Sequence, residues 1–351
     1  MNSQQNKEFV SLLENGLEGY FVESQILDNQ VKLSKIGIQN FRTKKCHSAI
    51  FDKNGSNIIY TCSQIILIAK LQNLQFIQQL EGHKAQINQL LLSQDDNVLI
   101  SCSNDKTIIL WRYNEVLQKW YYLNTFEKHT DSISSMILNK NETQLLTASA
   151  DNSIIVWSVN LKTNQIDYQY TLQHHKHEVN FLSLNPSENY LISYSKDKTI
   201  AFWSLNKGNN WQFRYVITQF NFDFGAKLKF LSDQMFIFVT NQNHEDSICF
   251  YELNKEKFEE NINKRFCLQK CKGQVNKSMD PIILNQNKNL IIISFNRQTY
   301  VLRRKLNGDL NIIFQESSKK KRIFSALSND ADYMIINTKN GHYCIFQLEY
   351  Y

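Results

Sequence analysis

Three segments of this chain repeat the same four residue types at the same spacing. Each copy holds a histidine, followed by a serine or threonine 18 residues later, an aspartate 22 residues after the histidine and a tryptophan 28 residues after it. The copies start 46 residues apart, at His83, His129 and His175. The other members are Ser101, Asp105, Trp111, Thr147, Asp151, Trp157, Ser193, Asp197 and Trp203. Four chemically distinct positions kept in register over three copies indicate a structural repeat.

Each repeat is predicted to contain four short strands. In the first copy, apolar and β-branched runs separated by turns rich in Asn and Asp predict strands at 87–92, 98–103, 107–111 and 120–126. A repeat of about 45 residues with four strands is typical of a β-propeller blade. The predicted fold class is therefore all-β.

The same alternation of strands and turns continues on both sides with weaker motifs and brings the number of units to seven. The predicted domains are an N-terminal tail at 1–20 and a single seven-bladed β-propeller at 21–351. The expected blades are 46–80, 81–126, 127–172, 173–217, 218–268, 269–315 and 316–351. The last unit ends near Leu348 without a fourth strand, and residues 31–39 alternate in polarity. We expect this N-terminal strand to complete the last blade, because closure removes an open sheet edge.

The segment 80–83 and the run from Ser101 to Trp111 resemble the WD40 repeat family. The resemblance is specific over residues 80–205 and implies a propeller that serves as a protein-interaction scaffold. Residues 110–115, 119–120 and 125–129 also resemble the propeller of the cytosolic iron–sulfur assembly targeting complex. This second resemblance implies a docking adaptor, which is kept as an alternative function.

The repeated residues have the chemistry of a structural hydrogen-bond network. A buried indole N–H, a hydroxyl, an imidazole and a carboxylate can satisfy one another in a chain. Ser, His and Asp together also suggest a nucleophilic triad, but an active site is needed once and this set occurs three times. We expect no catalytic residues and no enzyme activity.

Composition excludes several other classes. Lys and Arg number 39 against 33 Asp and Glu, a formal charge of +6, which is mild over 351 residues and does not indicate a nucleic-acid binder. The seven cysteines contain no CxxC pair, so neither a metal site nor a cofactor is expected. No apolar run is long enough to span a membrane. These features favour a cytoplasmic protein, with a nuclear location also open.

Three clusters have a functional and a simpler interpretation. The run 174–177 contains three histidines, but the repeat assigns His175 to the network and leaves the others as solvated loop residues. The basic run 319–322 has the composition of a nuclear address, but a solvated loop entering the last blade is the favoured interpretation. The run 303–305 faintly resembles the paired arginines of phosphoinositide-binding propellers, which gives a further alternative function.

The expected partners are other proteins, bound by a monomeric propeller within a larger complex. Loops on a rigid frame are where binding residues concentrate. The residues just before each network Asp and just before each inner strand should border one face beside the central channel. These candidate partner-binding residues are Gln86, Asn104, Ser132, Ala150, Glu178 and Lys196. The rim near Trp120 and Trp211 is the alternative surface.

Overall fold

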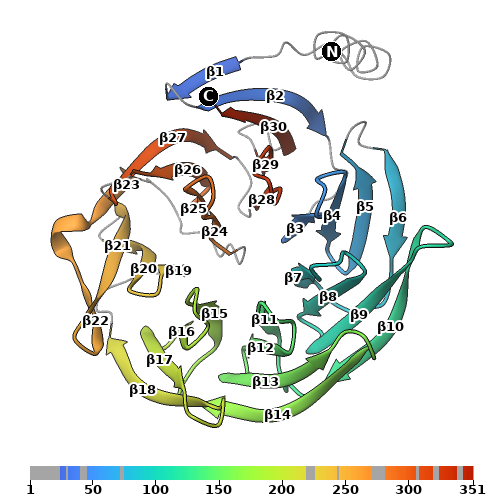
Figure 1. The fold of residues 1–351 in the computed structure, drawn as a ribbon, viewed down its shortest axis with the longest axis horizontal. Coiled ribbons are helices and arrows are strands. Elements are labelled where there is room, and N and C mark those ends of the chain that lie inside the picture. Colours follow the sequence, from blue (N-terminus) through green and yellow to red (C-terminus); the bar gives the residue numbers. More distant parts are fainter. Residues whose placement is uncertain are drawn as a thin grey trace.

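The computed structural model arranges seven antiparallel sheets as blades around a central channel (Figure 1). It describes residues 24–28, 31–39, 46–71, 75–218, 226–242, 245–270, 281–305, 308–318, 324–337 and 343–350. The predicted tail at 1–20 and the basic run at 319–322 lie outside these residues. Within the described ranges, no helix is long and apolar enough to cross a membrane.

Blades one to four are four-stranded and follow one another along the chain. The strands of blade one are β3 (Ala49–Phe51), β4 (Asn57–Cys62), β5 (Ile65–Lys70) and β6 (Phe76–Leu80). The strands of blade two are β7 (Ile87–Leu92), β8 (Val98–Ser103), β9 (Thr107–Asn114) and β10 (Lys119–Glu127). The strands of blade three are β11 (Ile133–Leu138), β12 (Gln144–Ser149), β13 (Ser153–Asn160) and β14 (Gln165–Gln173). The strands of blade four are β15 (Val179–Leu184), β16 (Tyr190–Ser195), β17 (Thr199–Leu205) and β18 (Trp211–Thr218).

Blades five to seven keep the same plan with weaker sequence motifs. The elements of blade five are β19 (Lys227–Ser232), β20 (Met235–Gln242), β21 (Glu245–Asn254), β22 (Lys257–Glu260), the 3-10 turn η1 (Ile262–Lys264) and β23 (Phe266–Lys270). The strands of blade six are β24 (Ile283–Asn285), β25 (Leu290–Phe295), β26 (Gln298–Arg304) and β27 (Leu310–Ser317). The strands of blade seven are β28 (Ser325–Leu327), β29 (Tyr333–Asn337), β30 (Tyr343–Tyr350), β2 (Val31–Gln39) and β1 (Ser24–Asp28). In blade five, β22 and β23 share the outer edge of β21.

The hydrophobic core lies between neighbouring blades. Every residue of β8 and of β25 is buried, because each blade packs against another sheet on both of its faces. One core cluster joins Val98 and Leu110 of blade two to Met136 and Trp157 of blade three. Side chains on inner strands add hydrogen bonds across the same boundary: Gln89 donates to the Met136 carbonyl over 3.0 Å and accepts from its N–H over 2.8 Å.

The N-terminal strand completes the last blade, as the sequence predicts. β2 pairs antiparallel with β30, from Val31 opposite Tyr350 to Gln39 opposite Tyr343. Val31 and Leu33 are buried in the core between blades six and seven. The sequence did not predict β1, which adds a fifth strand outside β2. The two ends of the described chain therefore meet in one sheet (Figure 1).

Candidate interaction face

The repeated residues of blade three form one continuous hydrogen-bond chain. Trp157 Nε1 donates to Thr147 Oγ1 over 2.9 Å. His129 Nε2 lies 2.8 Å from the same oxygen, and His129 Nδ1 lies 2.7 Å from Asp151 Oδ2. A neutral imidazole protonated on Nδ1 satisfies every group, because Nδ1–H donates to Asp151 while Nε2 accepts the Thr147 hydroxyl proton.

Blades two and four repeat this geometry closely. In blade two, the His83–Asp105, His83–Ser101 and Trp111–Ser101 distances are 2.8, 2.8 and 2.9 Å. In blade four, the corresponding distances within His175, Asp197, Ser193 and Trp203 are 3.0, 2.8 and 2.9 Å. The three histidines and the three Ser or Thr hydroxyl positions are buried. The structure thus brings together all twelve repeated residues, as three separate networks.

Each network carboxylate accepts four hydrogen bonds. Asp151 accepts from His129 Nδ1, from the Thr130 N–H at 3.0 Å, and from the N–H and hydroxyl of Ser153 at 3.0 and 2.6 Å. Burial by itself raises the pKa of this carboxyl group, but the hydrogen bonds from His129 and Ser153 outweigh burial. The net result holds the pKa of Asp151 well below its ordinary value. The pKa values of Asp105 and Asp197 are lowered by equivalent bonds.

The networks fix a turn whose neighbouring residues form one face of the disc. At each turn, the residue before the Asp donates its backbone N–H to the residue before the inner strand. The bonds are Asn104 to Gln86 at 2.8 Å, Ala150 to Ser132 at 2.8 Å and Lys196 to Glu178 at 2.9 Å. The six candidate partner-binding residues therefore lie in three equivalent pairs. We call the surface that they form the network face.

The side chains on the network face differ from blade to blade. Asn104 and Lys196 are exposed, while the other four are partly buried. Asn104 Oδ1 accepts from Asn88, whose Oδ1 accepts in turn from Gln86. Lys196 and Glu178 form an ion pair. The blade-three pair, Ala150 and Ser132, carries only a methyl group and a hydroxyl. The same backbone arrangement therefore presents two amides in blade two, two small side chains in blade three and two opposite charges in blade four.

Comparison with known proteins agrees with this geometry. The WD domain, G-beta repeat, family model matches residues 74–112, 120–158 and 167–204, about a third of the chain. The chain carries WD40 repeats. A crystal structure described as RRP9 WD40 repeats superposes with a TM-score of 0.66 over 93% of this chain and 100% of that chain. Sequence identity is 14%, so this likeness shows the fold alone. Comparison with curated protein sequences gave no match.

The other sequence-predicted positions occupy separate parts of the WD40 propeller. His174 stacks on Phe213 with ring centroids 3.8 Å apart, while the backbone carbonyl of His177 accepts from Ser195. Among the described residues, no group of three His, Cys, Asp or Glu side chains could hold a metal. On the rim, Trp211 is buried and donates from Nε1 to Gln144 over 2.8 Å, whereas Trp120 is partly buried.

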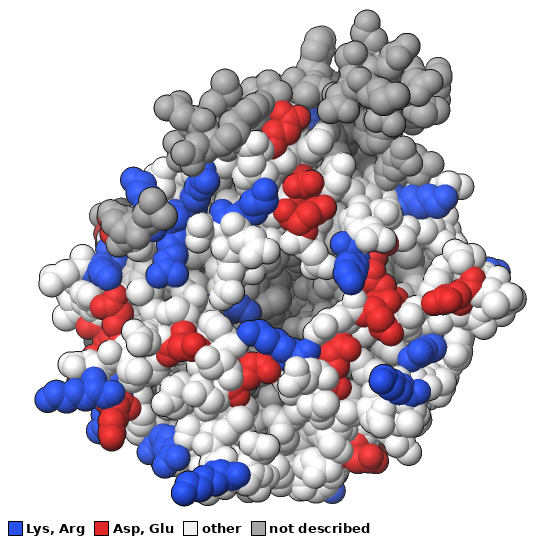
Figure 2. Space-filling model, in the orientation of Figure 1, with Lys and Arg blue, Asp and Glu red and all other residues white. Residues whose placement is uncertain are grey.

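Charge is mixed over the disc. On the face drawn in Figure 2, basic and acidic side chains are interspersed around a central hollow. Arg303 and Arg304 lie at the end of β26 in blade six and are both partly buried. An interspersed pattern differs from the one-signed face that nucleic-acid binders usually present.

A second set of repeated residues on the opposite face was missed by the sequence reasoning. Acidic side chains in the turns after the inner strands accept backbone N–H groups of the preceding blade. The bonds are Lys53 to Asp96 at 2.8 Å, Gln94 to Glu142 at 2.6 Å and Lys140 to Glu188 at 2.7 Å. The three acids recur at the same 46-residue spacing and all have positive φ, between 54° and 58°. The 46-residue spacing of these acids is the sequence pattern that could have identified them. Their hydrogen bonds join successive blades.

Proposed function

We propose that the protein is a non-enzymatic interaction scaffold, an adaptor subunit of an intracellular multiprotein complex. WD40 propellers are in general non-catalytic interaction platforms, and they generally bind other proteins. In blades two to four, the hydroxyl and imidazole groups of the networks are hydrogen-bonded to one another inside the blade. None of these groups is therefore available as a nucleophile or a general base. The partner is proposed to bind the network face.

One observation carries this proposal. The backbone pairs Asn104–Gln86, Ala150–Ser132 and Lys196–Glu178 have nearly the same geometry, yet their side chains differ in size and charge. A rigid backbone held by buried networks costs little conformational entropy on binding. Varied polar and charged side chains on such a frame supply specificity for one partner.

The double substitution Asn104→Glu and Lys196→Glu tests the network face. It should reduce capture of the partner proteins from a cell extract, because Lys196→Glu reverses a charge and places it against Glu178. The melting temperature should change little, since both side chains are exposed and neither belongs to one of the three His–Ser/Thr–Asp–Trp networks. Affinity capture followed by mass spectrometry measures the partners, and thermal unfolding measures the fold.

A matched control uses the opposite face. Asn141→Glu with Lys207→Glu introduces the same chemical changes at two exposed turn residues and should leave capture unchanged. If the network-face variant captures the same partners at full yield, the partner binds elsewhere, and the rim near Trp120 is the next surface to test. Equal loss in both double variants would mean that net charge, not the network face, controls capture.

A targeting adaptor for cytosolic iron–sulfur assembly is the second candidate. The segment that resembles such a propeller forms the end of β9, a turn and β10, and its tip exposes 91% of Val116 and 66% of Leu117. Exposed apolar residues of this kind favour protein docking. Replacing both with Ser should remove iron–sulfur assembly factors from the captured proteins if this candidate is correct. For the phosphoinositide alternative, flotation with phosphoinositide liposomes is the direct test.

A further inference from the structure

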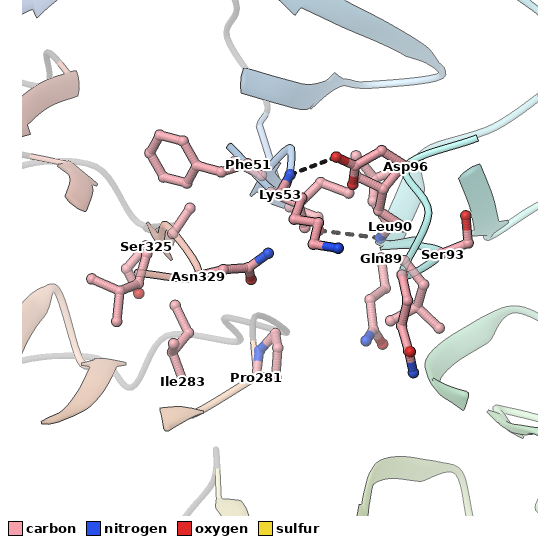
Figure 3. A pocket seen from close by; sticks show the side chains of 18 residues that line it. Phe51, Lys53, Gln89, Leu90, Ser93, Asp96, Pro281, Ile283, Ser325 and Asn329 are labelled. Carbon is pink, nitrogen blue, oxygen red and sulfur yellow. Dashed lines mark hydrogen bonds between the residues drawn. The ribbon is translucent and has the colours of Figure 1, made fainter. Parts of the chain in front are cut away.

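A cavity occupies the central channel at the end opposite the network face. Its volume is about 640 Å³, and its lining includes turn residues of the opposite face such as Lys140, Pro186 and Asn287. A second pocket of about 390 Å³ adjoins it (Figure 3). Both are lined by Gln89, Leu91, Pro281, Ile283, Leu327 and Asn329. The two spaces are therefore parts of one continuous hollow.

The larger cavity contains a cationic side chain that the described part of the chain does not neutralise. Lys229 lies in the middle of β19, the innermost strand of blade five, and is partly buried. The described residues offer its ammonium group neither an ion pair nor a hydrogen bond. Burial lowers the pKa of Lys229. A partly buried ammonium group that no described residue pairs is stabilised when an anion binds beside it.

The rest of the lining supplies an apolar wall. Leu91, Ile137 and Phe181 of three other blades line the same cavity as Lys229. Low polarity around a charge strengthens its attraction for an anion that displaces the remaining water. Apolar side chains together with a few charged and polar groups, here including Lys229, Lys140 and Glu188, are what small-molecule sites usually present.

The mouth of the hollow adds a second cation. Lys53 is exposed, and its side chain lines the adjoining pocket together with Asn329 (Figure 3). Two acidic residues also line the hollow: Asp96 accepts the Lys53 backbone N–H and Glu188 accepts that of Lys140. Lys140 itself donates from Nζ to the Pro186 carbonyl. Asp96 lies beside Lys53, whereas Lys229 has no carboxylate partner among the described residues, so Lys229 is the group that we expect to hold a ligand.

We propose that the channel binds a small organic anion, whose carboxylate or phosphate group is held by Lys229 and whose body packs on the apolar wall. A volume of about 640 Å³ lies within the range of roughly 300–1,000 Å³ that small-molecule pockets span. This site is separate from the network face, so it neither requires nor replaces protein binding there.

Calorimetric titration of the full chain with inorganic phosphate, and separately with succinate, tests the site at constant ionic strength in a chloride buffer. At least one anion should bind saturably with one equivalent per chain. Lys229→Met should weaken that binding about tenfold or more, the loss expected for a charge-assisted hydrogen bond. Without ligand, Lys229→Met should melt at or above the temperature of the natural chain. Binding of phosphate alone or succinate alone assigns the anionic group.

Matched variants separate the site from general charge effects. Lys196→Met removes a lysine of the network face and should leave anion affinity unchanged, while Lys229→Arg keeps the charge and should keep the binding. Lys229→Gln takes the place of the Met variant if that one does not fold. Absence of saturable binding to the natural chain overturns the proposal, as does equal affinity in the Lys229→Met or Lys229→Gln variant. Loss of affinity in Lys196→Met would place the anion on the network face instead.

Discussion

Trp157 and His129 meet at a single oxygen atom, Thr147 Oγ1, which lies 2.9 Å from the indole nitrogen and 2.8 Å from Nε2 of the imidazole. The side chains come from the third strand of blade three, the connection from blade two, and the second strand of blade three. This hydroxyl group is the link between the hydrophobic core, where Trp157 packs, and the turn that Asp151 closes. The stability of the network should therefore depend on it.

Thr147→Val preserves the shape of this side chain and removes its hydroxyl. It should lower the free energy of unfolding by about 1–3 kcal/mol, because the Trp157 N–H and His129 Nε2 both lose their partner in a buried site. Thr130→Val, at an exposed position of the same blade, should stay within about 0.5 kcal/mol. Denaturant unfolding measures both, and equal effects would show that the network contributes no stability.

Asp151→Asn should change how stability depends on pH. The folded pKa of Asp151 lies below its unfolded value of about 3.9, so the unfolded chain binds more protons in the interval between them. The contribution of Asp151 is fully present above about pH 4 and is lost as pH falls through the folded pKa. The Asn variant should be less stable at neutral pH and should lose less stability below pH 4. Chemical unfolding across this range measures the difference.

A suitable control for the pH experiment is Asp167→Asn, at an exposed position on β14. Its curve should follow that of the natural chain at every pH. A curve for Asp151→Asn that stays parallel to the natural one below pH 4 would contradict the role of this carboxylate as a hydrogen-bond acceptor.

Removal of β2 should destabilise the whole ring. A chain lacking residues 1–40 loses the buried Val31 and Leu33 and exposes the edge of β30. We expect it to aggregate or to melt well below the full chain. A chain lacking only residues 1–23 retains β1 and β2 and should melt with the full chain. Thermal unfolding of the full chain and the two shortened chains measures this effect. A normal melting temperature without β2 would show that the ring does not need this strand to close.

Glu142 combines a backbone cost with an inter-blade bond. Its φ is 54°, a left-handed conformation that favours glycine, and its carboxylate accepts the Gln94 N–H over 2.6 Å. Glu142→Ala loses the bond and keeps the backbone cost, so it should be about 0.5–1 kcal/mol less stable than Glu142→Gly, which is relieved of that cost. Stability measurements on both variants test this order. An alanine variant as stable as the natural chain would mean that the bond contributes nothing.

Part of this structure could be predicted because, in those segments, the local sequence pattern favours the same strands and turns that the folded propeller contains. The alternation of β-branched runs and Asx turns placed the strands of blade two to within a few residues, since each turn uses its own side chains, such as Asp105 bonding to Thr107 two residues on. Blade five was harder to predict because Tyr251, stacked on Phe236 at 4.7 Å, replaces a polar network with aromatic packing that has no fixed spacing. The fifth strand β1 also had no recognisable sequence pattern, since only its pairing with the outer edge of β2 places it in the sheet.

The amino-acid sequence by itself determined the repeat, the four-strand blade and the identity of the buried networks, because those depend on residues within one 46-residue unit. Only the tertiary structure decided what depends on several blades at once. Asp96, Glu142 and Glu188 join consecutive blades, and their partners are backbone groups that carry no sequence signature. Lys229 likewise has the appearance of an ordinary strand residue until ring closure places Leu91, Ile137 and Phe181 around the same cavity. The burial that lowers its pKa is a property of the closed ring, since desolvation arises only when the blades meet.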